Sequence, residues 1–426
     1  MTVDVVPSST TTVRRIDPTD AAQLDAVLDM DLLVWADSQQ VPREELLRQT
    51  PARAGFLATR EGEAAGIAGS WDLEVAVPAT GGGASLRPTE GLTWVGVHPD
   101  HRRRGVLTAL MRHHLRWTRD EQRRSTAVLK ASEPGIYGRF GYGVASSTMM
   151  ATFARGTDFA APERVRTLAD ATTLRTSTTG PEHAERLRDV LRRCAQVHPG
   201  HIVRGVIDTA RILTDIPLGR GEREPGRLLW ATRDGQDVGA AYFHRTPKWS
   251  AGRAEGTVGV YFLVSVDAGT RLALARRLTD LDLMATTEFW IPADDPLALW
   301  HPSLRPLAGA MTDDLWLRIV DLPAAVAERG HATDLDVVIE VRDPIIDENA
   351  GTWRWTARDG VGQCVRVDTA PQITLDIVDL GSVWLGAQTL AARAQAGYVT
   401  ERRPGAVAAL DAALCTPTQP VGAMDF

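Results

Sequence analysis

The feature that most constrains the fold of this chain is a repeat at the scale of a whole domain. The pattern Ala-Thr-Arg-acid-Gly-x-x-x-Gly occurs twice, from Ala58 to Gly66 and from Ala231 to Gly239. In both places a further strand-like segment follows, and a strand then leads into a segment with helical spacing of its apolar residues. This order predicts two copies of one α/β unit, although two hairpins could also share common turn residues.

Length and composition narrow the class of protein. The 426 residues allow two or three domains, and 44% hydrophobic with 24% charged residues is ordinary for a globular protein. A net charge of −7 argues against a nucleic-acid-binding surface over the whole molecule and favours cationic small ligands. The three cysteines form no CxxC pair, which argues against a disulfide framework or zinc site and fits a reducing compartment. Because no signal segment or membrane span is visible, we expect a cytoplasmic protein without membrane contacts.

The order of the expected strands and helices divides the chain into three blocks. We place the first domain at residues 1–155, the second at 165–305 and a small α+β domain at 312–426. The first block contains an expected hairpin that turns at Glu61-Gly62. The third block contains segments that alternate apolar and polar residues, which is typical of half-buried strands, and the segment ITLDIVDLGSVWLG (373–386) is expected to continue this sheet.

Three consecutive arginines precede a glycine in the segment VHPDHRRRGVLTAL, at the start of an expected helix. A helix N-terminus leaves N–H groups unpaired and carries partial positive charge, so it binds anions, and phosphate in particular. Gly105 allows close backbone approach, and Arg102 and Arg103 can add charge-assisted hydrogen bonds. The combination predicts a pyrophosphate site that matches neither a Walker A loop nor a Rossmann fingerprint. A basic triplet standing alone would more simply be solvated surface.

Together with the later run LKASEPGIYGRFGYG, this segment resembles the acyl-coenzyme A signature of one branch of the GNAT N-acetyltransferases, the Eis-type aminoglycoside acetyltransferases. Arg102 and Gly105 match the R-x-x-G loop, whereas Leu107 departs from the usual third small residue. The resemblance covers nearly the whole chain. It implies an α/β (α+β) fold with tandem GNAT domains, the second degenerate, and a C-terminal domain similar to sterol carrier proteins. The second copy lacks the arginine triplet.

The resemblance also implies how acetyl-CoA is bound, as a cosubstrate and without a metal ion. No HExxH or other metal-ligand spacing occurs in the sequence. The implied acetyl-CoA-binding residues are Val95, Val97, Arg102, Arg103, Gly105, Val106 and Ser132.

Tyr137 is the implied general acid, because a phenol with a pKa near ~10 can protonate a departing thiolate. The alternative is that Tyr137 only packs among glycines, which is the interpretation we prefer for Tyr142. The implied base is the terminal carboxylate of Phe426, and the preceding Asp425 would attract a polycationic acceptor. Trp94, Trp35 and Asp37 complete the predicted acceptor site.

Three functions are open at this point. The first is an acetyl-CoA-dependent N-acetyltransferase that modifies several amines of aminoglycosides or similar polyamines, with antibiotic resistance and a homohexamer implied by the resemblance. The second keeps the chemistry but transfers acetyl to a protein lysine or another small amine. The third is a non-catalytic lipid-binding or scaffold protein that acts through its C-terminal domain. The intact R-x-x-G loop and Tyr137 favour an enzyme.

Overall fold

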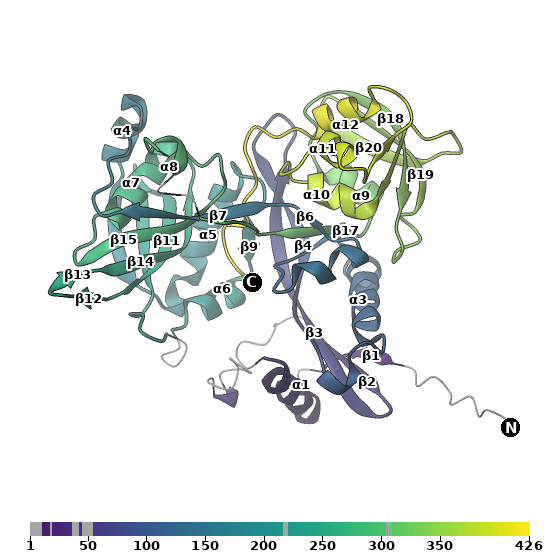
Figure 1. Cartoon of the computed structure of the whole chain (residues 1–426), viewed down its shortest axis with the longest axis horizontal. Helices are drawn as coiled ribbons and strands as arrows, with labels where there is room; N and C mark the ends of the chain where they lie inside the picture. The colour runs from purple at the N-terminus through teal and green to yellow at the C-terminus, as the bar shows by residue number, and fades with distance from the viewer. Residues whose placement is uncertain are drawn as a thin grey trace.

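The chain folds around three sheets (Figure 1). The computed structural model describes residues 11–17, 19–35, 42–44, 54–215, 220–303, 305, 307 and 309–426. Figure 1 shows the first sheet at the centre, the second sheet at the left and the C-terminal domain at the upper right. No helix among these residues is long and apolar enough to cross a membrane.

The first sheet has the order β1-β2-β3-β4-β5-β17-β6, and β9 pairs with the later half of β3. The strands are β1 (Thr12–Arg15), β2 (Ala54–Arg60), β3 (Glu63–Pro78), β4 (Ala84–Val97), β5 (Thr126–Leu129), β6 (Gly143–Val144), β9 (Ile202–Arg204) and β17 (Trp316–Ile319). The helix α1 (Ala21–Val34), capped by Asp20, packs on one face. The helix α3 (Val106–Arg116) packs on the other through its apolar stripe and continues into a π-helical turn, Trp117–Glu121.

The second sheet has the order β16-β7-β15-β14-β11-β10-β8. Its strands are β7 (Ser147–Ala154), β8 (Thr173–Thr178), β10 (Arg227–Arg233), β11 (Gln236–Thr246), β14 (Gly256–Ser265), β15 (Met284–Ile291) and β16 (Met311–Asp313). Its helices are α4 (Glu163–Asp170), α5 (Ala184–Ala195), α6 (Val206–Leu213), α7 (Ala268–Thr279) and α8 (Pro296–Leu299). The strands β12 (Trp249–Ser250) and β13 (Arg253–Ala254) form a separate hairpin.

The two sheets contain the same unit. In each, an antiparallel three-strand meander is followed by a helix and a strand parallel to the third: β2-β3-β4, α3 and β5 in the first, and β10-β11-β14, α7 and β15 in the second. The equivalent glycines Gly66 and Gly239 make the same close approach. A Cβ at Gly66 would meet Val106 and Leu110 of α3, and a Cβ at Gly239 would meet Thr270 and Leu274 of α7. The tandem arrangement predicted from the sequence is confirmed.

Several strands join a sheet outside their predicted domain, and β9, from residues 165–305, does so by pairing with β3 of the first sheet. β7, which the sequence prediction includes in residues 1–155, pairs with β15 in the second sheet. β17, from residues 312–426, enters the first sheet between β5 and β6. The boundaries at 155, 165, 305 and 312 therefore describe the order along the chain better than the membership of the sheets.

The C-terminal domain has a five-stranded sheet with the order β20-β19-β18-β21-β22. Its elements are α9 (Leu322–Glu328), β18 (Leu335–Arg342), β19 (Gly351–Arg358), β20 (Val361–Arg366), β21 (Ile373–Asp376), α10 (Ile377–Val383), α11 (Leu390–Gln395), β22 (Thr400–Glu401) and α12 (Ala406–Leu414). We expected residues 373–386 to be strand, but Asp376 and Asp379 form a capping box that starts α10. Trp355 and Trp384 are fully buried in the core.

Candidate active site

The strand β4 has a bulge where the sequence analysis places the acyl-CoA site. Between Ile67 and Gly69, β3 advances by two residues while its partner β4 advances by three. Trp94 lies in the bulge with a φ of 51°, which is rare for a residue with a side chain. Bulges change the direction of side chains and are common beside active sites. Here Val95 and Val97 pack with residues of α3, whereas Trp94 packs with residues of α1.

The strands β4 and β5 separate at the same place. Their parallel pairing consists of two residue pairs, of which the second joins Gly91 to Val128. Beyond Gly91, β4 continues to Val97, and no strand in the described part of the chain pairs with it on this side. The backbone N–H and C=O groups of this segment can therefore bind an extended ligand. A pantetheine arm along Val95 and Val97 would fit this geometry.

The N-terminus of α3 lies at the end of β4 and is open. A turn with two left-handed residues, Arg103 (φ 60°) and Gly105 (φ 83°), leads into the helix. Among the described residues, no side chain caps the first turn, and a Cβ at Gly105 would meet no atom within 4 Å. Arg102, Arg103 and Arg104 are all exposed. This arrangement gives an anion both unpaired backbone N–H groups and arginine side chains.

Val106 is also predicted to bind acetyl-CoA, but its side chain packs inside the protein. Only 1% of Val106 is exposed, and it packs against Gly66. Its backbone N–H, in the first turn of α3, is the group that an anion could reach. Ser132 is exposed, three residues past the end of β5.

Tyr137 lies between two short 3-10 turns in the IYGRFGYG run. Its ring is half-buried against the same apolar cluster as Val95 and Val97. Burial, with a smaller effect from Glu133, raises the pKa of the phenol, so the hydroxyl keeps its proton at neutral pH. Tyr142 is fully buried, and its ring lies edge-on to Tyr137 with centroids 6.2 Å apart. Tyr137 therefore has the protonation state that a proton donor needs, whereas Tyr142 packs.

Two of the residues predicted to bind the acceptor lie together on the α1 side of β4. Trp35 is the C-cap of α1, and a Cβ at Gly96 would lie 3.1 Å from its ring. Trp94 packs against the same apolar cluster as Trp35. Asp37, the third predicted residue, lies outside the described residues.

The C-terminal tail lies against both repeated units. Met424 is buried in a cluster of the second unit that contains Trp230. Phe426 packs against the largest core cluster, and its ring lies 3.0 Å from the position of a Cβ at Gly91. The last residue of the chain is therefore next to the point where β4 and β5 separate. Figure 1 shows the tail running from the C-terminal domain to this region.

Three residues that the sequence analysis missed hold this tail. The Nζ atom of Lys130 lies 2.5 Å from a carboxylate oxygen of Asp314 and 2.9 Å from one of Asp425. Arg204 donates a hydrogen bond to the backbone carbonyl of Asp425 at 2.6 Å. Lys130, Arg204 and Asp314 come from distant parts of the chain, so no local motif could have indicated them.

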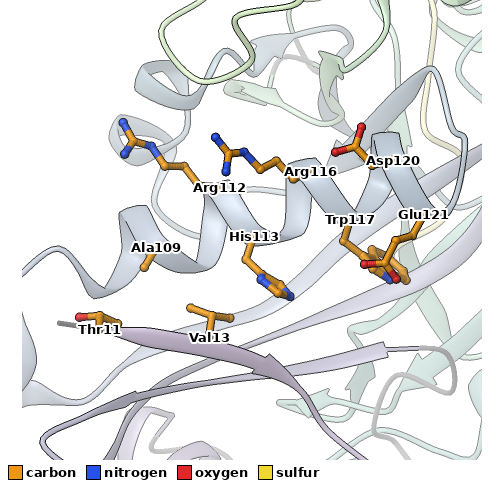
Figure 2. A pocket seen from close by; sticks show the side chains of 9 residues that line it. All are labelled: Thr11, Val13, Ala109, Arg112, His113, Arg116, Trp117, Asp120 and Glu121. Carbon is orange, nitrogen blue, oxygen red and sulfur yellow. The ribbon is translucent and has the colours of Figure 1, made fainter.

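A separate cavity of about 390 Å³ lies between β1 and α3 (Figure 2). His113 extends from the helix toward Val13 and Trp117 leaves the same side of the helix beside Glu121, whereas Arg112 and Arg116 extend from the other side. None of the residues predicted for acetyl transfer lines this cavity. In the described residues, no group of three or more His, Cys, Asp or Glu side chains could hold a metal ion.

Comparison with known families agrees with this geometry. Residues 15–145 match the acetyltransferase (GNAT) domain family, and residues 322–422 match the sterol carrier protein domain family. The first match includes the β4 bulge, the α3 N-terminus and Tyr137. The second match corresponds to most of the C-terminal domain and ends in the tail.

Known proteins resemble the chain over most of its length. An uncharacterised N-acetyltransferase of Streptomyces coelicolor is 35% identical over 82% of this chain and 83% of that protein. The N-acetyltransferase Eis of Mycobacterium bovis is 31% identical over 87% of this chain and 89% of that protein. The crystal structure of Eis1 from Mycobacterium abscessus superimposes with a TM-score of 0.79 at 29% identity, covering 97% of this chain and all of that one.

Proposed function

Since the chain belongs to the Eis-type family of GNAT N-acetyltransferases, we propose that it transfers acetyl from acetyl-CoA to several amines of aminoglycosides or similar polyamines. The observation that carries this proposal is the position of the C-terminus. The ring of Phe426 lies at Gly91, where β4 leaves β5. The proposal assigns the terminal carboxylate, the open N-terminus of α3 and Tyr137 to one acetyl-transfer site in the first unit.

In the proposed reaction, each of these groups has a separate task. The N-terminus of α3, with Arg102 and Arg103, binds the pyrophosphate, and the open edge of β4 orients the pantetheine arm. The terminal carboxylate of Phe426 accepts the proton that the acceptor amine loses as its nitrogen bonds to the acetyl carbon. The carbon–sulfur bond then breaks, and Tyr137 donates its proton to the departing thiolate.

The charges around the tail support a polycationic acceptor. The side chain of Asp425 is 85% exposed, although it also contacts Lys130, and the side chain of Asp72 is 48% exposed beside Arg124. A carboxylate of this kind can bind an ammonium group that does not react while a neighbouring amine does. We propose that the acceptor is a small molecule and that the protein is a cytoplasmic homohexamer.

The test is thiol release from acetyl-CoA by the purified chain, measured against aminoglycosides, linear polyamines and lysine peptides. We expect turnover with several aminoglycosides and more than one acetyl group per acceptor by mass spectrometry. Turnover on lysine peptides or simple amines only would replace the acceptor class and keep the chemistry. Absence of acetyl-CoA binding would rule out both enzymatic functions and favour the lipid-binding or scaffold alternative.

A further inference from the structure

The side chain of Lys130 connects the interior of the protein to its C-terminal tail. Lys130 directly follows β5, and 22% of its side chain is exposed. Its ammonium group contacts one buried and one exposed carboxylate. The side chain of Asp314 is 6% exposed, and that of Asp425 is 85% exposed. A fixed interior anion thus holds Lys130, which in turn holds the penultimate residue of the chain.

Asp314 is itself fixed by three donors. Besides Lys130, the hydroxyl of Ser146 and the backbone N–H of Gly422 donate to it, both at 2.7 Å. Burial disfavours the charged form of Asp314, but Lys130 and these hydrogen bonds outweigh burial and lower its pKa. Burial also opposes the charge of Lys130, and the carboxylates of Asp314 and Asp425 reverse this and raise its pKa. The pair is therefore ionised at neutral pH, and Asp314 contacts the tail directly at Gly422.

Arg204 binds the tail through the backbone of Asp425. It belongs to β9, and its guanidinium donates to the backbone carbonyl of Asp425 at 2.6 Å while lying 5.2 Å from the centre of the Trp71 ring. Burial lowers the pKa of Arg204 to about 10, so it remains charged at neutral pH. Asp425 is thus held by its side chain and by its backbone, one residue before the terminal carboxylate.

We propose that Lys130, Arg204 and Asp314 form a tail-binding site that positions the terminal carboxylate of Phe426 for its reaction with the acceptor amine. This inference rests on the proposed function, in which that carboxylate is the base. A chain end is normally frayed, and a base that samples many orientations loses most of its effect on the rate. Lys130 acts through Asp425 and is therefore a positioning residue, not a catalytic residue.

The main experiment compares Lys130→Met in two backgrounds, the full chain and a chain that ends at Met424. In the full chain we expect kcat to fall about 10- to 100-fold while the Kd for acetyl-CoA stays unchanged, because only the base is displaced. In the shortened chain the same substitution should reduce kcat no further, since its target is already gone. Lys130→Arg should restore most of the activity of the full chain.

Two further variants separate positioning from folding. Lys130→Met leaves Asp314 buried without its counter-ion, so Lys130→Met/Asp314→Asn removes both charges and should show the same loss of kcat in a folded protein. Asp425→Asn removes the exposed partner alone and should lower kcat about threefold to tenfold. The matched control is Asp336→Asn, which breaks the exposed pair with Arg354 in the C-terminal domain and should leave kcat unchanged.

The outcomes distinguish this inference from the function on which it rests. An equal loss of kcat from Lys130→Met in both backgrounds would show that Lys130 acts without the tail and would overturn the positioning role alone. A chain ending at Met424 that turns over as fast as the full chain would show that the terminal carboxylate is not the base. That result would overturn the base assignment and the tail-binding role together.

Discussion

The helices α3 and α7 begin at equivalent places in two copies of one unit, yet their N-termini differ. In the first unit, residues 98–105 lead from β4 into α3, and in the second only residues 266–267 lead from β14 into α7. The longer connection supplies three exposed arginines and a left-handed glycine. The shorter one has neither.

In the second unit, the carboxylate of Asp267 lies at the N-terminus of α7, where an anion would otherwise bind. Asp267 caps α7 by accepting a hydrogen bond from the N–H of Thr270 at 2.8 Å, and it pairs with Arg233. Burial opposes the charge of Asp267, but these bonds outweigh it and lower its pKa. Leu168 of α4 also lies against Gly269 in the first turn. The second unit thus satisfies its own helix N-terminus, whereas no side chain of the described residues caps that of the first unit.

This difference shows that the packing of the unit and its chemistry depend on separate residues. Both copies keep the glycine that lets the helix approach the meander, Gly66 in one and Gly239 in the other. Only the first copy has the arginine-rich turn and the uncapped helix N-terminus. A fold can therefore persist as a structural element after its site is lost, because the core and the site use different positions.

The largest effect should come from Tyr137→Phe. This change removes the tyrosine that follows the parallel strand β5 in the first unit and that the second unit lacks after β15. Residues 292–310, which follow β15, include no tyrosine. We expect kcat to fall about 10²- to 10⁴-fold with an unchanged Kd for acetyl-CoA, because only proton donation is lost. Since the pKa of Tyr137 is raised, the phenol of the native enzyme should stay protonated, and donation should persist, up to at least about pH 10.

The control for that variant is Tyr142→Phe. The hydroxyl of Tyr142 is buried and has no hydrogen-bond partner among the described residues, so its removal should affect neither kcat nor folding strongly. Equal rates for Tyr137→Phe and the native enzyme would remove Tyr137 from the mechanism.

The next effect tests the comparison directly by giving α3 the carboxylate that α7 has. Gly105→Asp should weaken acetyl-CoA binding about 100-fold in calorimetry, because a negative charge would lie where the pyrophosphate binds. Gly105→Asn introduces a side chain of similar shape at the same left-handed φ without the charge, and it should weaken binding much less. If both variants bind acetyl-CoA equally, charge at this helix end does not separate the two units.

Substituting the arginines of the turn before α3 should have a smaller effect on acetyl-CoA binding. Arg102→Gln and Arg103→Gln should each weaken acetyl-CoA binding about 5- to 30-fold, the loss of one charge-assisted hydrogen bond. Because these side chains are exposed, the loss should shrink as the salt concentration rises. Arg253→Gln, in the exposed β12–β13 hairpin of the second unit, is the control and should bind as the native protein does.

Local signals allowed much of the first unit to be predicted. The hairpin turn at Glu61-Gly62 has positive φ at both residues, and the helix after Gly105 begins at Val106, as their residue types predict. The exchange of β7 and β17 could not be predicted, because strand pairing between distant segments leaves no periodic signal in either one. The role of Lys130 could not be predicted for the same reason, because its partners Asp314 and Asp425 are distant in the sequence.

The helix α10 could not be predicted for a different reason. The segment IVDLGSV is a short apolar run, and periodicity cannot tell a buried helix from a buried strand over such a length. Its capping box depends on two aspartates three residues apart, where the familiar pattern has serine or threonine followed by glutamate or glutamine. The local pattern of this segment is compatible with a helix and with a strand, and the structure shows that it is a helix.

The smallest effect belongs to the reverse experiment on α7. Asp267→Ala removes the N-cap and the partner of Arg233, and we expect it to lower the free energy of unfolding by about 1 kcal/mol in thermal or urea denaturation. Asp267→Asn keeps a capping oxygen and should lose less. Neither variant should gain a second acetyl-CoA per chain in calorimetry, because α7 would still lack the longer turn and its arginines. Binding of two acetyl-CoA molecules by Asp267→Ala would mean that one capping carboxylate, not the length of the connection, is what separates the two units.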